Sequence, residues 1–177
     1  MAEDIERYLQ QQQSGALPAD EVARAKQLYI QLGCFACHGA NYEGNQGPII
    51  VGMPVDEIIH QVRNGAPNPQ DMPAFDQTMI SDADLEILAK FLNSLTIADT
   101  AVVIPDEVRT HLEKAYDALT AGDKAGVETH LKTALKAAQD TGAGEGLIKT
   151  LDDLTEDLEE ETWQKDIELH LDILLGK

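Results

Sequence analysis

Cysteine is scarce in this sequence, and its only two copies, Cys34 and Cys37, stand in one pentapeptide. A structural zinc site needs about four ligands, and no second cysteine pair or cluster of histidines completes one. A thioredoxin-like redox pair is expected between a strand and a helix in an alternating pattern, which this sequence lacks. A simple disulfide would leave the adjacent His38 unexplained. These ordinary uses of a cysteine pair therefore account poorly for the motif.

Basic residues are also few. The sequence has 13 lysines and arginines and 32 aspartates and glutamates, which gives a net charge of −19. Both halves are acidic: residues 1–96 carry 5 basic and 13 acidic side chains, and residues 97–177 carry 8 and 19. Phosphate contacts need clustered Lys and Arg, so the composition disfavours nucleic acid and anionic lipid surfaces. It favours a protein partner that is basic or that docks through an apolar patch.

Long apolar runs are missing as well. No segment approaches the roughly 18 residues that a membrane span requires. The first residues, Met1–Asp4, show no basic stretch followed by an apolar one, so no signal peptide is visible. We expect the chain as given to be soluble, without a membrane span. With 177 residues and 43% hydrophobic content, it can bury one core or two small ones.

The motif Cys34-Phe35-Ala36-Cys37-His38 has a specific chemical interpretation. Two thiols three positions apart can reach the two vinyl groups on one edge of a porphyrin, and the next residue then falls beneath the iron. The pentapeptide therefore predicts one haem c, bound by thioether links to Cys34 and Cys37, with His38 as the proximal iron ligand.

An electron-transfer haem also needs a sixth ligand, and a thioether raises the potential relative to a second histidine. Met72 stands in a proline-stiffened segment between two predicted helices, where a loop could fold across the distal face. Met53 follows His38 so closely that the chain between them could hardly pass around the porphyrin to its other face. Met79 is expected to contact the core or the rim of the haem pocket. We favour Met72, partly on the resemblance described next. The full set of candidates is Met53, Met72, Met79, His60, His111, His130 and His170.

Residues of about 20–95 resemble a class I cytochrome c. The features that carry the resemblance, in chain order, are Ala25–Tyr29, Cys34–Gly39, Gly47-Pro48, a helix ending at Asn64-Gly65, Met72–Phe75 and the helix Asp84–Leu92. The resemblance implies an electron carrier with His38 and Met72 on the iron.

Further roles follow from the same resemblance. It implies that the Pro48 carbonyl accepts a hydrogen bond from His38, which would orient the ring and tune its basicity. It also implies that Tyr29 and Phe91 touch where the first and last helices cross. One departure is that Met72 follows His38 by only 34 positions, fewer than usual, which suggests trimmed loops and a more exposed haem edge.

Apolar periodicity independently predicts an all-α fold, since no strand-like alternation is convincing. One helix is expected before the motif, with Pro18 at its start, and another over Val55–Val62, ended by Gly65. Ser81 can cap a third helix, with Ile80 and Leu85 placed as a hydrophobic staple.

Apolar periodicity in the rest of the chain predicts a three- or four-helix bundle over 105–177. A short turn at 121–123 should join its first two helices as an antiparallel hairpin. The leucines of 147–158 and the apolar residues of 163–174 fall on nearly opposite sides of a continuous helix. Either the chain breaks near Glu159–Glu161, or one long helix presents different faces to different neighbours. We therefore divide the chain into an N-terminal arm (1–17), a monohaem cytochrome c domain (18–96), a linker (97–104) and this bundle.

Three functions are consistent with the sequence. The first is transfer of single electrons between redox partners, which needs no catalytic constellation, and none is visible. The second is a gas or redox sensor with a labile sixth ligand. The third is a haem subunit fixed within a larger oxidoreductase. The bundle is expected to serve docking or homodimerisation, and the protein is placed in the periplasm because covalent haem attachment occurs outside the bacterial cytoplasm.

Overall fold

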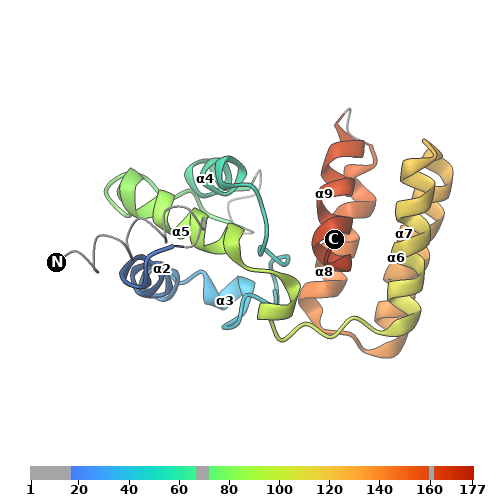
Figure 1. Cartoon of the computed structure of the whole chain (residues 1–177), viewed down its shortest axis with the longest axis horizontal. Coiled ribbons are helices and arrows are strands. Elements are labelled where there is room, and N and C mark those ends of the chain that lie inside the picture. Colours follow the sequence, from blue (N-terminus) through green and yellow to red (C-terminus); the bar gives the residue numbers. More distant parts are fainter. Residues whose placement is uncertain (1–16, 67–71, 160–161) are drawn as a thin grey trace, which may run out of the picture. The chain divides into compact units, whose positions relative to one another are not determined.

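The computed structural model describes residues 17–66, 72–159 and 162–177, so almost all of the expected N-terminal arm lies outside the described residues (Figure 1). Across these ranges the chain forms eight α-helices and one 3-10 helix, with no strand. The predicted all-α class is therefore confirmed.

Packing divides the chain into two units. The first contains the described residues up to Cys34 together with Gly52–Leu95. The second contains Phe35–Val51 together with Thr96–Lys177. The segment that follows Cys34 along the chain thus packs with the C-terminal helices, which matters for the site described below.

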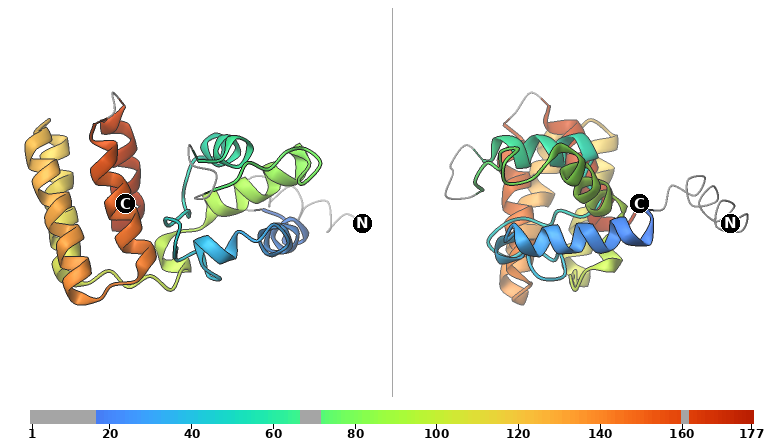
Figure 2. Two further views of the ribbon diagram at one scale, coloured as in Figure 1. Left: turned by 180° about the vertical axis from the view of Figure 1, so that it is seen from behind. Right: turned by 90° about the vertical axis from the view of Figure 1, so that its left-hand side faces the viewer.

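Three helices build the first unit: α2 (Ala19–Gln31), α4 (Val55–Asn64) and α5 (Asp82–Ser94). α5 lies between the other two and packs against both (Figure 2). The buried apolar side chains come mostly from the helical stripes that the sequence predicts. They are Ala25, Leu28, Tyr29, Ile58, Val62, Ile80, Leu85, Leu88, Ala89, Phe91 and Leu92.

Local chemistry explains where α5 starts. The Ser81 hydroxyl accepts the Asp84 N–H at 3.1 Å, which satisfies one of the free donors in the first turn of α5. Ile80 and Leu85, on either side of that cap, are both buried, as the predicted staple requires. Arg24 on α2 pairs with the Asp84 carboxylate through two nitrogens, at 2.9 and 2.7 Å, and so joins α2 to α5.

The second unit contains a four-helix bundle. Its helices are α6 (Asp106–Thr120), α7 (Lys124–Thr141), α8 (Glu145–Asp157) and α9 (Trp163–Leu175), preceded by the short α3 (Phe35–His38) and the 3-10 helix η1 (Ile97–Asp99). Each bundle helix packs on the next, and α9 returns to α6, so the four close a ring. The bundle prediction is confirmed, with four helices as the outcome.

Residues 145–175 form two helices rather than one, because the helix is interrupted between α8 and α9. α8 ends at Asp157 and α9 begins at Trp163, which settles the alternative left open by the sequence. Two apolar stripes on opposite sides of one helix cannot face a single core, whereas two antiparallel helices can both turn inward. Leu151 and Leu154 on α8 and Ile167 and Leu171 on α9 are accordingly all buried.

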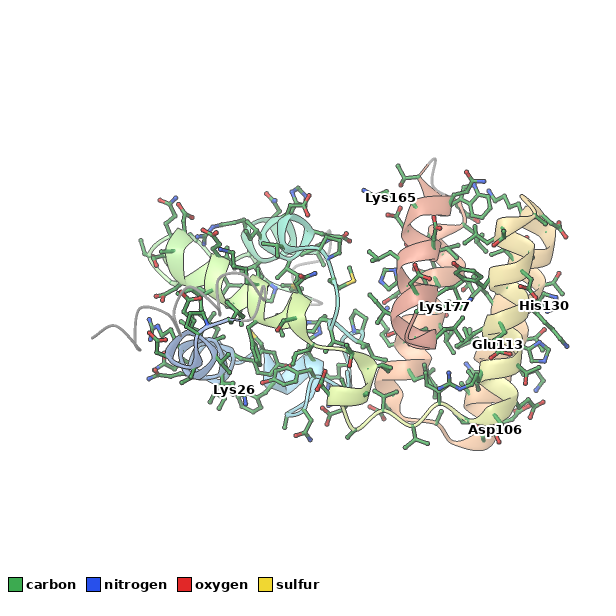
Figure 3. The ribbon with its side chains drawn as sticks, in the orientation of Figure 1. Lys26, Asp106, Glu113, His130, Lys165 and Lys177 are labelled. Carbon is green, nitrogen blue, oxygen red and sulfur yellow. The ribbon has the colours of Figure 1, made fainter. Side chains whose placement is uncertain are left out.

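The C-terminus is tied to the bundle by a cation–π contact. Lys177, labelled in Figure 3, places its ammonium 3.2 Å from the centre of the Tyr116 ring of α6. The contact joins the residue after α9 to α6 and supports the closure of the ring.

Candidate haem site

The cysteine motif begins where α2 ends. Helix α2 stops at Gln31, and Gly33 then turns the chain with a positive φ of 77°. A residue with a side chain would be strained in that conformation, so glycine suits the turn. The Cys34 N–H donates to the Tyr29 carbonyl oxygen at 3.1 Å. The first cysteine is therefore held by the last turn of α2, in which Tyr29 is buried.

The rest of the motif forms one helical turn, α3. The Gly39 N–H closes this turn on the Phe35 carbonyl at 3.0 Å. Cys34 and Cys37 are not joined by a disulfide, and both are partly buried. Addition to porphyrin vinyl groups requires thiols that are not already oxidised to a disulfide.

His38 is held in one tautomer by the loop that follows it. Its Nδ1 lies 3.0 Å from the Pro48 carbonyl oxygen. A carbonyl can only accept, so Nδ1–H is the donor and Nε2 of the neutral ring keeps its lone pair free. Burial lowers the pKa of His38, although the bond to Pro48 opposes this shift. The ring is thus a neutral imidazole with one nitrogen available to a metal.

Backbone hydrogen bonds fold this loop over the histidine. The Gly44 N–H donates to the His38 carbonyl, and the Gly47 N–H donates to the Cys37 carbonyl, both at 2.9 Å. A Cβ on Gly47 would lie 2.8 Å from Cε1 of His38, closer than real Cβ contacts come. Glycine at 47 therefore lets the backbone lie directly against the imidazole edge.

Met72 lies in the first unit, in the connection between α4 and α5. Residues 72–80 of this connection, called the Met72 segment below, are hydrogen-bonded to α4. The Ala66 N–H donates to the Met72 carbonyl at 2.9 Å, and the Phe75 N–H donates to the Val62 carbonyl at 2.8 Å. Arg63 adds hydrogen bonds to the carbonyls of Phe75 and Ile80, at 2.9 and 3.0 Å, and an ion pair to Asp82 at 2.5 Å. Met72 itself is partly buried.

The other ligand candidates have different surroundings. His60 is exposed on α4 and contacts Asn64 of the same helix at 3.1 Å. His170 places Nδ1 2.8 Å from the Asp166 carbonyl on α9. Met79 is 56% exposed. Met53 and the α6–α7 pair His111 and His130 are partly buried.

The donor set fits a haem better than a bare metal ion. Two cysteines at the attachment spacing precede an imidazole whose Nε2 is available. Within the described ranges no three His, Cys, Asp or Glu side chains gather as a metal site would require. The hydrogen bond expected between His38 and Pro48 is present. The ligand roles of Cys34, Cys37, His38 and Met72 stay predictions.

Sequence reasoning missed two contributors. Nothing in the sequence pairs Arg63 with the Met72 segment. Thr150 did carry a signal, because it interrupts the leucine stripe of α8 at a position that faces the core, and its hydroxyl accepts the Ile49 N–H at 3.0 Å. A polar residue at a buried helical position is a reason to look for a buried hydrogen bond.

Comparison with known proteins identifies a family for part of the chain. A family model described as "cytochrome C oxidase, cbb3-type, subunit III" matches residues 20–92. Searches of curated proteins and of solved structures returned no match. Residues 20–92 are therefore a cytochrome c domain of the cbb3-type subunit III family, and helices α6–α9 follow this domain without an assigned family.

Proposed function

We propose that the chain is a monohaem c-type cytochrome that transfers single electrons between redox partners. Cys34 and Cys37 would carry the thioether links, and His38 and Met72 would ligate the iron. Haem c, when bound, supplies a one-electron redox centre. The observation that carries the proposal is the His38–Pro48 hydrogen bond at 3.0 Å, which leaves Nε2 available directly after the Cys34–Cys37 pair.

Each residue has a separate task in this proposal. The thiols fix the position of the cofactor, and the Pro48 carbonyl fixes the orientation of His38. The thioether of Met72 would favour the reduced state relative to a nitrogen ligand. Arg63 would hold the Met72 segment in place by its bonds to two carbonyls of that segment.

The proposal extends to domains, partners and location. Residues 18–96 would form the haem domain, and 105–177 would serve docking or homodimerisation. The charge of −19 supports a partner with a basic or apolar docking surface. No helix among the described residues is long and apolar enough to cross a membrane. A periplasmic location is supported by the site of covalent haem attachment in bacteria.

A second candidate is a haem subunit fixed within a larger oxidoreductase. It is favoured by the description of the matching family, which names a subunit of an oxidase. A fixed subunit should copurify with its partner at high salt, whereas a transient electron-transfer encounter buries little area and is screened. Copurification in low and high salt therefore separates the two.

The experiment that tests the proposal compares optical spectra of the wild type with those of Met72→Ala. Oxidised and reduced spectra are recorded with and without carbon monoxide, after a pyridine haemochrome assay has established covalent haem. We expect the wild type to show the weak far-red Met–iron band and to ignore carbon monoxide. Met72→Ala should lose the band and bind carbon monoxide.

Met79→Ala is the matched control, because Met79 is 56% exposed and lies in the same connection between α4 and α5. It should keep both wild-type properties. Ready binding of carbon monoxide by the wild type would reject Met72 as a ligand and favour the sensor function. A wild type without covalent haem would reject the proposed function altogether.

A further inference from the structure

One peptide group near His38 is hydrogen-bonded on both sides. Its carbonyl, from Pro48, accepts the His38 Nδ1–H at 3.0 Å. Its N–H, from Ile49, donates to Oγ1 of Thr150 at 3.0 Å, across 101 positions of sequence. Ile49 is 3% exposed and Thr150 2% exposed, so water does not compete for the second bond. The same amide thus links the proximal histidine to α8.

Thr150 is set up to accept this bond. Its own hydroxyl proton is committed to the Gly146 carbonyl, one turn earlier on α8, at 2.8 Å. The oxygen therefore offers a lone pair to Ile49, because its donor is already used. Among the described residues Thr150 is the one polar side chain that is fully buried, and it stands among the leucines of α8.

Glycines allow the helix and the loop to come this close. A Cβ on Gly146 would lie 2.5 Å from Cα of Gly44, and a Cβ on Gly44 would lie 2.7 Å from Cα of Gly146. Any side chain at these positions would push the loop off α8. The first turn of α8 is therefore seated directly on the backbone that leads to Pro48.

We propose that Thr150 is a positioning residue for His38 and sets its donor strength through the Pro48–Ile49 peptide group. The inference rests on the proposed function, because donor strength acts on a bound haem iron. A bond donated by the Ile49 N–H polarises the amide and makes the Pro48 oxygen a stronger acceptor. A stronger acceptor draws the Nδ1 proton away and makes Nε2 of His38 a better electron donor. A better donor favours the oxidised iron and lowers the reduction potential.

The test measures the midpoint potential of the haem-loaded full chain by redox titration. Thr150→Val keeps the shape and removes the acceptor, so its potential should be higher than that of the wild type. We expect the equilibrium constant of reduction to change several-fold, less than the tenfold that corresponds to about 59 mV for one electron. Thr150→Ser keeps the hydroxyl and should return to the wild-type value.

Thr133→Val is the matched control. Thr133 is on α7, and its hydroxyl bonds within that helix, to the Thr129 carbonyl at 2.7 Å. Its loss removes the same kind of intrahelical bond that Thr150 makes, without touching the peptide next to His38. The potential should therefore stay at the wild-type value.

Gly146→Ala provides a second variant that keeps the Thr150 hydroxyl. Alanine has the higher helix propensity, so α8 itself is not weakened, but the new Cβ must displace the Gly44 backbone. The potential should shift in the same direction as in Thr150→Val. Equal potentials in wild type, Thr150→Val and Gly146→Ala, with haem attached in all three, would overturn the inference and leave the proposed function standing.

Amide exchange of Ile49, followed by NMR, tests the bond without reference to the haem. Exchange should be slow in wild type and Thr133→Val, and faster in Thr150→Val. If no haem attaches to the wild type, the proposed function fails, and this exchange comparison still reports whether Thr150 holds the peptide. Unchanged exchange in Thr150→Val would reject the link between α8 and Pro48.

Discussion

The histidines of this chain differ in the hydrogen bonds that their ring nitrogens make. His38 and His170 each place Nδ1 on a backbone carbonyl. The Nδ1 atoms of His111 and His130 are buried without a hydrogen-bond partner in the described part of the chain. Their ring centres lie 5.8 Å apart, where α6 packs on α7; Figure 3 labels His130 on this hairpin. Neither Nδ1 atom is therefore fixed by a hydrogen bond, in contrast to those of His38 and His170.

His111 should make the bundle sensitive to acid. Burial lowers the pKa of His111, and the charges of Lys114 and His130 lower it further, while Glu107 opposes them. As pH falls through the unfolded value of 6.5 toward the lower folded pKa, the unfolded chain takes up a proton that the folded chain refuses. Stability is thus fully present above pH 6.5 and is lost progressively below it.

Urea unfolding at pH 7.5, 6.5 and 5.5 checks this expectation. His111→Gln should lose less free energy of unfolding across this range than the wild type. His60→Gln, at an exposed position on α4, is the control and should keep the wild-type profile. Parallel losses in the wild type and His111→Gln would show that His111 does not contribute.

Helix α4 organises the Met72 segment from one side. It ends at Asn64, and Gly65 takes a positive φ of 70°, which turns the chain sharply. A Cβ on Gly65 would lie 2.6 Å from the Met72 carbonyl oxygen, so the segment passes close to the turn. Arg63, in the last turn of α4, reaches forward to the same segment. The end of α4 therefore supplies both the sharp turn at Gly65 and the Arg63 side chain that holds the Met72 segment.

Arg63→Met should loosen this segment. The substitution keeps an apolar stem but leaves the carbonyls of Phe75 and Ile80 without their charged donor, which costs about 2 kcal/mol of unfolding free energy. Thermal unfolding measures the loss, and amide exchange should be faster around residues 72–80. Lys90→Met is the control, because its ion pair with Glu86 is exposed and should contribute less than about 1 kcal/mol. Equal stabilities of the two variants would contradict the anchoring role.

The whole molecule is dominated by negative charge. Thirteen basic side chains against 32 acidic ones leave a net charge of −19, spread over both halves of the chain. Several pairs that the structure does form are exposed i,i+4 contacts within one helix, such as Lys132 with Glu128 and Lys136 with Asp140. These neutralise charge locally and leave the long-range field in place.

Association with a redox partner should therefore depend on salt in a direction set by the charge of the partner. Electron transfer to a basic, lysine-rich protein should slow by about tenfold or more between low ionic strength and 0.5 M salt, because screening removes the attraction. Stopped-flow rates measure this effect, with an acidic redox protein as the control, whose rate should rise with salt. A rate to the basic protein that does not change with salt would indicate docking through an apolar patch.

The sequence by itself determined the features that depend on neighbours along the chain. The attachment motif is contiguous, helix starts such as Ser81 involve residues three positions apart, and apolar periodicity shows the all-α class. The His38–Pro48 bond, which spans only 10 positions, was expected from the resemblance to class I cytochromes c rather than from the local pattern. Tertiary structure alone decided that α8 and α9 are separate helices, that Arg63 holds the Met72 segment, and that Thr150 reaches Ile49 across 101 positions. The physical reason is that these contacts depend on which helical faces bury one another, and the pattern of one segment does not specify its partner.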